Sequence, residues 1–270
     1  MEPGPKTGQA DPWQSGDAYE RYMGRWSRQL APRFLHWQGP PAGRRWLDVG
    51  CGTGALSAAI LDGHGPDGVI AVDPSEGFLA TAKSRLPARV VLHRAAAGEL
   101  PLPDASVDVA VASLVLNFVP DAQAALREMA RVTARGGQVV ACVWDYAGKM
   151  DLIRIYWDAA ARLGLLGPGQ DEGERFPLCR QGALAAAFAG AGLRQVRTSA
   201  IEMTMRFADF DDYWQPFLGG QGPAPAHAMS LDEAARKQLR DLIRARIPTH
   251  PDGTIVLAAR AWAARGAVVK

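Results

Sequence analysis

The sequence has few cysteines, no long apolar run and no excess of one charge, and each shortage excludes a class of protein. Its three cysteines, Cys51, Cys142 and Cys179, are odd in number and far apart, which argues against a disulfide framework and a zinc site. The 30 basic and 28 acidic residues are mixed along the chain, so charge gives no support to a nucleic-acid partner. No stretch reaches the roughly 18 apolar residues of a membrane helix. We expect a soluble, cytoplasmic protein without a membrane span.

The alternation of short apolar runs with helical stretches predicts an α/β fold. Near-continuous apolar strands between helices are typical of a parallel sheet covered on both faces. Two further strands follow, at 193–203 and 254–263, and an insertion with a helix at 231–246 separates them. A capping box of Ser230 and Glu233 is expected to begin that helix. The five apolar runs are residues 45–49, 69–72, 90–93, 107–112 and 138–144.

The most informative segment runs from a strand into a glycine-rich turn, with the sequence WLDVGCGTG at residues 46–54. Glycines allow a tight turn close to a ligand, and the following helix offers free N–H groups, so a nucleotide-like ligand is implied. The spacing also satisfies the dinucleotide fingerprint, with Asp73 near the place of the ribose acid. The Asp48 carboxylate would repel a pyrophosphate but suits an ammonium or sulfonium cation. A cationic nucleoside therefore fits better than NAD.

This segment resembles the first motif of class I S-adenosylmethionine-dependent methyltransferases, and three more motifs follow in family order. Residues 69–75 resemble the second motif, in which the acid at the strand end holds both ribose hydroxyls. Residues 98–108 and 113–119 resemble the third and fourth, and the helix at 126–132 is similar to the family's run into strand five. The order and spacing are similar to those of the ubiquinone/menaquinone-type subgroup, methyltransferase type 11.

The resemblance implies a Rossmann-like, doubly wound sheet of seven strands. Five parallel core strands and an antiparallel last strand would carry an N-terminal helical lid and a helical insertion between the last two strands. We expect a mobile lead-in at 1–14 and one methyltransferase domain at 15–270. The expected parts of this domain are lid helices at 15–40, a cofactor-binding core at 45–146, a helical segment at 147–192, a helical insertion at 204–250 and the last strand at 254–264.

The implied cofactor is S-adenosylmethionine, with S-adenosylhomocysteine as product and no metal. Ala96 departs from the family pattern, because an acid that contacts the adenine amino group usually stands there, so adenine recognition would fall to backbone groups. Cys51 has no histidine partner placed for it, which favours a packing role over a nucleophile. The residues expected at the cofactor are Asp48, Gly50, Cys51, Gly52, Gly54, Asp73, Pro74, Phe78, Ala96, Ala97, Gly98, Ser113, Asn117 and Phe118.

The methyl acceptor is expected where the carboxyl ends of strands four and five meet the lid and the insertion. Aromatic side chains there suit an apolar or planar acceptor, although each also fits a core position. Arg21, Arg25 or Arg28 of the lid would pair with the methionyl carboxylate. The expected pocket residues are Tyr22, Trp26, Trp144, Tyr146, Phe176, Trp214 and Phe217.

Methyl transfer from a sulfonium needs chiefly the positioning of two reactants, and a general base is optional. His227, in a flexible part of the insertion, or Asp145, after the fifth strand, would serve an acceptor hydroxyl. Three functions stay open. The first is a methyltransferase for a small-molecule acceptor, as a monomer or homodimer. The others are an NAD(P)-dependent oxidoreductase using the same glycine loop and a catalytically silent cofactor-binding regulatory protein.

Overall fold

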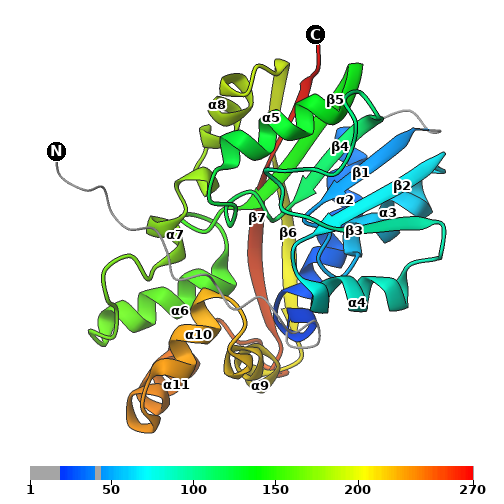
Figure 1. The fold of residues 1–270 in the computed structure, drawn as a ribbon. Coiled ribbons are helices and arrows are strands. Elements are labelled where there is room, and N and C mark those ends of the chain that lie inside the picture. Colours follow the sequence, from blue (N-terminus) through cyan, green and yellow to red (C-terminus); the bar gives the residue numbers. More distant parts are fainter. Residues whose placement is uncertain (1–18, 40–43, 270) are drawn as a thin grey trace, which may run out of the picture.

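Seven strands form one sheet in the order β3-β2-β1-β4-β5-β7-β6, drawn as arrows in Figure 1. The computed structural model describes residues 19–39 and 44–269 of the chain. β1 to β5 run parallel to one another, and β7 runs antiparallel to both β5 and β6. The Rossmann-like sheet with an antiparallel last strand is therefore confirmed. The strands are β1 (Arg45–Val49), β2 (Gly68–Asp73), β3 (Val90–Arg94), β4 (Val107–Ser113), β5 (Thr133–Trp144), β6 (Arg194–Phe207) and β7 (Ile255–Ala267).

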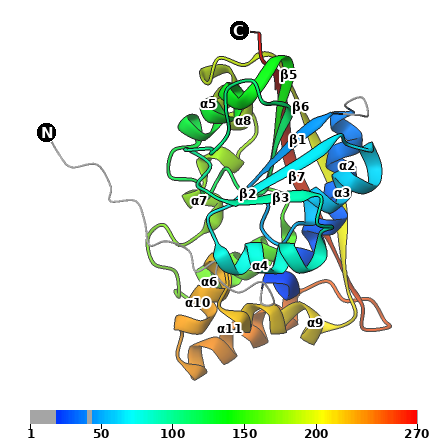
Figure 2. The same cartoon turned by 45° about the vertical axis from the view of Figure 1, so that its right-hand side comes forward.

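The central strands are apolar along most of their length because helices cover both faces of the sheet. Leu47 of β1, Ala110 of β4 and Val139 of β5 lie side by side across the ladder, and all three are fully buried. Figure 2 shows α2 and α3 on one side of the sheet and α5 and α8 on the other. The sequence pattern of buried parallel strands thus corresponds to a three-layer sandwich.

The helices follow the strands in the expected alternation. They are η1 (Glu20–Gly24), α2 (Arg25–Gln38), α3 (Ala55–His64), α4 (Glu76–Arg85), α5 (Ala122–Val132), α6 (Asp151–Arg162), α7 (Glu172–Arg175), η2 (Pro177–Cys179), α8 (Ala183–Gly190), α9 (Phe210–Trp214), η3 (Gln215–Gly219), α10 (Pro223–Ser230) and α11 (Glu233–Arg246). In the described part of the chain, none of them is both long and apolar enough to cross a membrane.

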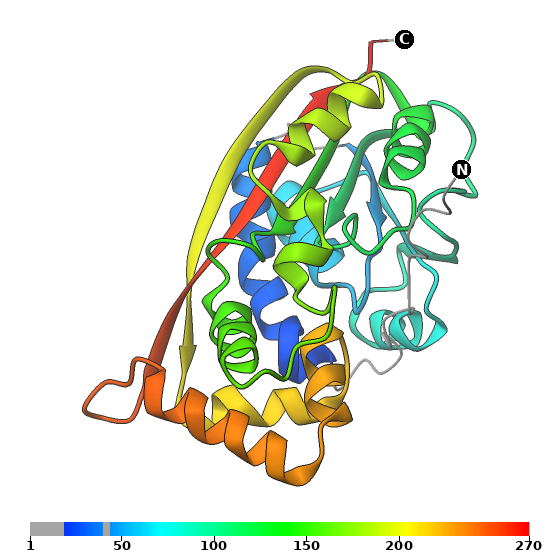
Figure 3. The same cartoon turned by 90° about the vertical axis from the view of Figure 1, so that its left-hand side faces the viewer.

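A group of helices lies beyond the carboxyl ends of the parallel strands, at the bottom of Figure 3. It contains α6, which follows β5, and α9, α10 and α11, which stand between β6 and β7. The insertion leaves the sheet after Phe207 and returns at Ile255, and these two residues are paired in the β6–β7 ladder. The insertion therefore begins and ends at one point of the sheet.

The start of α11 differs from the expected capping box. Asp232 is the N-cap residue, and its side chain accepts a hydrogen bond from the backbone N–H of Ala235. The Ser230 hydroxyl instead donates to the backbone oxygen of His227 at 2.8 Å, because Ser230 is the last residue of α10. The expectation for Ser230 was wrong because two helices meet there rather than one helix and a loop.

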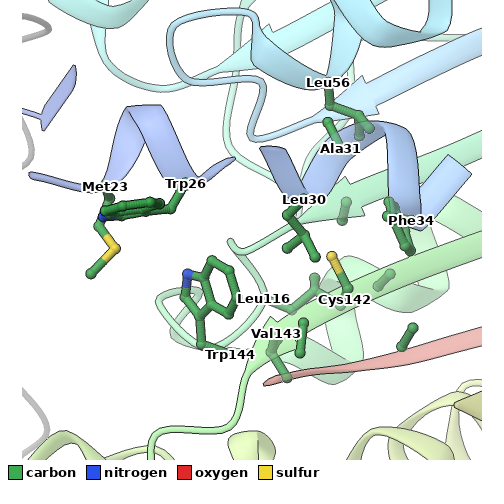
Figure 4. Close-up of a cluster of buried hydrophobic side chains, with 14 of the residues drawn as sticks. Met23, Trp26, Leu30, Ala31, Phe34, Leu56, Leu116, Cys142, Val143 and Trp144 are labelled. Carbon is green, nitrogen blue, oxygen red and sulfur yellow. The ribbon is translucent and has the colours of Figure 1, made fainter. Parts of the chain in front are cut away.

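The N-terminal helical segment has two roles along its length. Leu30 and Phe34 of α2 are fully buried, and Figure 4 shows them among side chains of the sheet such as Cys142 and Val143. This half of the segment belongs to the sandwich. The preceding turn, η1, is a π-helical turn that reaches the glycine-rich loop after β1 through Glu20. The expected lead-in at 1–14 lies outside the described residues.

Candidate active site

The turn after β1 requires glycine for two different physical reasons. Gly50 has a φ of +70°, and a Cβ added to it would lie 2.4 Å from a methyl carbon of Val115. Gly52 has a φ of +54°, but no atom lies within 4 Å of its would-be Cβ. The first glycine therefore permits close packing inside the protein. The second leaves open space on the side from which a ligand can approach the backbone.

Asp73, at the carboxyl end of β2, holds this turn in place. One carboxylate oxygen accepts a hydrogen bond from the Gly52 N–H at 2.9 Å, and the other accepts from the Ser75 N–H at 2.8 Å. Burial raises the pKa of this carboxyl, although the two N–H groups oppose the shift. Each carboxylate oxygen has a second lone pair, so Asp73 can still accept hydrogen bonds from two ligand hydroxyls.

Asp48 of β1 is buried beneath the same turn. One carboxylate oxygen accepts a hydrogen bond from the Ser57 hydroxyl at 2.7 Å, and the other has no partner among the described residues. Burial raises the pKa of Asp48 to about 7. An unpaired buried carboxylate oxygen is unfavourable by itself, so it fits a site for a cation.

A small cavity of about 30 Å³ lies between Asp48 and the glycine turn. This is about the share of liquid volume that one water molecule takes, so a nucleoside fits only when one wall moves. The N-terminal segment forms one wall through Tyr19 and Ser27. The lining also includes Asp48, Gly52, Thr53 and Ser113.

Glu20 fastens the N-terminal segment to the glycine turn, and the sequence had given no reason to select it. Its carboxylate accepts a hydrogen bond from the Thr53 hydroxyl at 2.5 Å and pairs with Arg85 at 2.7 Å and with Arg28. Arg25, another arginine expected at the cofactor, instead pairs with Asp212 of α9 at 2.7 Å. Arg28, unlike Arg25, therefore lies close to the turn through Glu20.

The residues expected around an adenine ring lie in, or just after, the loops that follow β2, β3 and β4. Phe78 is buried with its ring 5.4 Å from that of Tyr19, whereas Phe118 packs against Phe176 at 5.0 Å. Pro74, Ala96 and Gly98 are exposed and Ala97 is buried. An adenine ring in this place would therefore meet backbone groups and aromatic side chains.

The fourth motif combines unsatisfied and strained groups. The Ser113 hydroxyl is 3.4 Å from the Cys142 sulfur, and the Asn117 amide nitrogen is buried without a partner among the described residues. Leu114, between them, has a φ of +63°, which is unfavourable for a leucine. Strain of this kind collects at binding sites.

Burial raises the pKa of the Cys51 thiol far above its usual range, which supports a packing role for that residue.

The expected pocket aromatics are all buried, and they form two groups. Tyr146 and Phe176 are 5.9 Å apart beside Phe118. Trp144 ends β5, and Figure 4 shows it across from Trp26. The second group lies under the insertion: Tyr22 contacts Phe217 at 5.5 Å, Phe217 contacts Trp214 at 5.8 Å, and Trp26 contacts Phe207 at 5.1 Å.

His227 does not lie in a flexible loop, and that expectation was wrong. It belongs to α10 and is buried against α6. Its Nδ1 lies 2.6 Å from the Tyr156 hydroxyl and its Nε2 lies 2.9 Å from the Leu165 carbonyl oxygen. The carbonyl can only accept, so Nε2 carries the proton and Nδ1 accepts from Tyr156. With both ring nitrogens engaged, His227 is not placed to act as a general base.

The Asp145 carboxylate is also hydrogen-bonded within the protein, which leaves it no free role toward a methyl acceptor. Its carboxylate accepts from Nε and Nη2 of Arg260 at 2.9 and 2.6 Å, and from the backbone N–H groups of Gly148 and Lys149. This set of bonds joins the loop after β5 to β7. The structure therefore corrects the expectation that Asp145 serves as a base.

Replacing Asp145 with asparagine should lower the free energy of unfolding by about 2–3 kcal/mol, because Arg260 loses a charged partner at a buried site. Urea unfolding measures this change. The control is Glu202→Gln, which removes a distant, exposed partner of the same arginine at 3.9 Å and should change stability by less than about 0.5 kcal/mol. A large loss of cofactor affinity in Asp145→Asn without a loss of stability would contradict this structural role.

Comparisons with known proteins place this geometry in context. Residues 47–141 match the model of the methyltransferase domain family. Over 128 residues the chain is 40% identical to an uncharacterized methyltransferase of Mycobacterium tuberculosis, covering 47% of this chain and 49% of that protein. Over 103 residues it is 40% identical to the demethylmenaquinone methyltransferase of Geobacillus kaustophilus, covering 36% of this chain and 44% of that protein. The chain thus spans about half the length of the curated relatives it matches.

The fold has solved counterparts over nearly its whole length. A candidate type II methyltransferase of Anaeromyxobacter dehalogenans superimposes with a TM-score of 0.64 at 24% identity, covering 90% of this chain and 96% of that one. At this identity the likeness concerns the fold alone. The family match at residues 47–141, by contrast, includes the glycine turn, Asp48 and Asp73.

Proposed function

We propose that this chain, whose residues 47–141 form a domain of the methyltransferase family, transfers a methyl group from S-adenosylmethionine to a small acceptor with a planar apolar body. The observation that carries the proposal is the unpaired, buried carboxylate oxygen of Asp48 beside the glycine turn. A cation is the group that such an oxygen accommodates best, and this cofactor has both an ammonium and a sulfonium.

The residues around the turn fit the parts of the cofactor. Asp48 would face the cationic amino-acid portion, and the backbone at Gly52 would lie against it. The free lone pairs of Asp73 would accept hydrogen bonds from the two ribose hydroxyls, while Gly52 and Ser75 hold the carboxylate in place. Phe78 would provide a flat apolar surface for the adenine.

The chemistry asked of the protein is mainly positioning. When bound, S-adenosylmethionine would supply a methyl group on a sulfonium. The acceptor's electron pair would bond to this carbon, the electron pair of the broken carbon–sulfur bond would stay on sulfur, and a proton displaced from the acceptor would pass to bulk solvent. The chain holds both reactants about 3–3.5 Å apart and excludes water. The buried aromatics on α2, β5 and the insertion suit the second task. Because His227 and Asp145 are engaged elsewhere, the reaction proposed here uses no histidine or aspartate base from these positions.

Two observations support a planar apolar acceptor. The walls that surround the expected acceptor position are aromatic, and flat rings stack favourably on such walls. One relative is named a demethylmenaquinone methyltransferase. A dinucleotide oxidoreductase is disfavoured, because the Asp48 carboxylate would meet a pyrophosphate. Nothing in the described residues favours a silent regulatory protein.

Isothermal titration with S-adenosylmethionine across pH 6 to 8 tests the proposal. The raised pKa of Asp48, about 7, means that the carboxyl is partly protonated near neutrality, and a bound cation would expel the proton. We expect affinity to rise about tenfold from pH 6 to pH 8, with proton release visible as a dependence of the heat on the buffer. Asp48→Asn should bind about 10–100-fold more weakly and without this pH dependence.

The matched control is Asp62→Asn, an exposed aspartate on α3, which should bind as the wild type does. Absence of binding by the wild type at millimolar cofactor would refute the proposed function.

The raised pKa of Asp48 also predicts how the stability of the ligand-free protein depends on pH. A carboxyl with a raised folded-state pKa stabilises the fold when protonated, so this contribution is full below pH 4 and is lost as pH rises through 7.

A further inference from the structure

Two aromatic side chains of the N-terminal segment carry buried hydrogen-bond donors that have no partner among the described residues. The Tyr22 hydroxyl and the Trp26 indole N–H have no hydrogen-bond partner among the described residues, and each side chain is 2% exposed. Burying a donor without a partner costs free energy, and phenylalanine would fill the Tyr22 position without that cost. The two donors therefore call for a hydrogen-bond acceptor that the described residues do not supply.

Neighbouring polar aromatics are satisfied, which sets these two apart. Tyr213 donates to the Leu152 carbonyl oxygen at 3.1 Å, Tyr156 to His227 at 2.6 Å, and the Trp157 N–H to Glu172 at 2.9 Å. All three belong to the same aromatic cluster under the insertion. Of these five side chains, the two from the N-terminal segment have no hydrogen-bond partner in the part of the chain that the structure describes.

The unpaired donors border a continuous aromatic wall. Tyr22 contacts Phe217, Phe217 contacts Tyr213 at 5.4 Å, Tyr213 contacts Phe207 at 5.5 Å, and Phe207 contacts Trp26. A ligand beside this wall would meet flat apolar surface and two N–H or O–H donors.

The wall adjoins the candidate cofactor cavity through the same helical segment. Tyr19 and Ser27, which line that cavity, lie within one turn of Tyr22 and Trp26, respectively. A molecule against Tyr22 and Trp26 would thus lie next to the cofactor position. Tyr22 is also a permanent donor, because burial, reinforced by the negative charge of Glu172, raises its pKa well above the usual range.

We propose that Tyr22 and Trp26 are the polar recognition groups of the methyl-acceptor site, donating hydrogen bonds to a carbonyl or phenolic oxygen on a planar apolar substrate. This assignment rests on the proposed function and narrows its substrate class to oxygenated ring compounds. The wall contributes apolar contact, and the two donors select for the oxygen.

Stability of the ligand-free protein gives the first test. Tyr22→Phe removes a hydroxyl that has no partner, so the melting temperature should stay the same or rise. Tyr213→Phe is the matched control from the same cluster: it deprives the Leu152 carbonyl of its donor and should lower the melting temperature by about 2–4 °C. An equal loss in Tyr22→Phe would show that its hydroxyl is bonded within the protein and would overturn the assignment.

Ligand selectivity gives the second test. The probes are 1-tetralone and tetralin, two bicyclic molecules that differ only at one carbon, a carbonyl in the first and a methylene in the second. Equilibrium dialysis against protein saturated with S-adenosylhomocysteine should show about tenfold tighter binding of 1-tetralone. Tyr22→Phe and Trp26→Phe should each reduce that preference, whereas Tyr213→Phe should retain it.

Equal binding of the two probes, binding of neither, or an unchanged preference in Tyr22→Phe would overturn the assignment. Failure of the proposed function is distinguishable from these outcomes. It would appear as an absence of S-adenosylhomocysteine binding in the wild type, and the melting temperatures of Tyr22→Phe and Tyr213→Phe would still report on the two hydroxyls.

Discussion

Gly50→Ala is expected to abolish detectable cofactor binding and to lower the free energy of unfolding by about 2–5 kcal/mol. The added methyl group would lie 2.4 Å from a methyl carbon of Val115, and alanine is unfavourable at a φ of +70°. The loop can relieve the contact only by moving the backbone that faces the ligand. Urea unfolding and isothermal titration measure the two effects.

Two variants separate the causes. Gly52→Ala introduces a similar backbone strain but no contact, so it should cost only about 1 kcal/mol of stability. Val115→Ala in the Gly50→Ala background removes both methyl groups that crowd the new side chain but leaves Cβ, and should restore part of the lost stability. Equal stability of Gly50→Ala and Gly52→Ala would contradict the role assigned to Val115.

Asp73→Asn is expected to weaken S-adenosylhomocysteine binding by about 100-fold. Asparagine has one carbonyl oxygen, so either the Gly52 or the Ser75 N–H would face an amide group instead of an acceptor. The substitution also removes lone pairs that would hold the ribose hydroxyls. Two contributions to affinity are therefore lost together, the shape of the turn and the direct contact.

Glu76→Gln is the control for Asp73→Asn. Glu76 lies three residues later, is exposed, and pairs only at 3.4 Å with an exposed arginine, Arg94. The Glu76→Gln variant should match the wild type in affinity for S-adenosylhomocysteine and in stability. If Asp73→Asn binds S-adenosylhomocysteine as the wild type does in isothermal titration, Asp73 does not contact the ribose.

The fold was predictable because its strands and turns are encoded locally. The run from Val107 to Ser113 is apolar on both faces, which indicates a buried parallel strand wherever its neighbours lie. The glycine turn follows β1 directly, so its position in the sheet was fixed once the strand was recognised. Asp48 and Asp73 were found for the same reason, since each stands in or at the end of a strand.

Residues whose roles depend on distant partners were not predictable. His227 is fixed by Tyr156, 71 positions away, and Asp145 by Arg260, 115 positions away. Neither distance leaves a pattern in a single sequence. Glu20 was missed because its partners Thr53 and Arg85 come from two other elements. A polar residue in a strand end or loop can be recognised from the sequence, but its availability for chemistry depends on these long-range bonds.

The pairing of Phe207 with Ile255 has a consequence for how proteins of this architecture can diversify. Because the insertion leaves and rejoins the sheet through two hydrogen-bonded neighbours, its length and sequence can change without altering the register of any core strand. The insertion can therefore be exchanged as a unit. A different set of helices joined at these two residues would change the walls around a substrate but would preserve the part of the site that faces the nucleoside. Selectivity and cofactor use would then evolve, or be engineered, independently of each other.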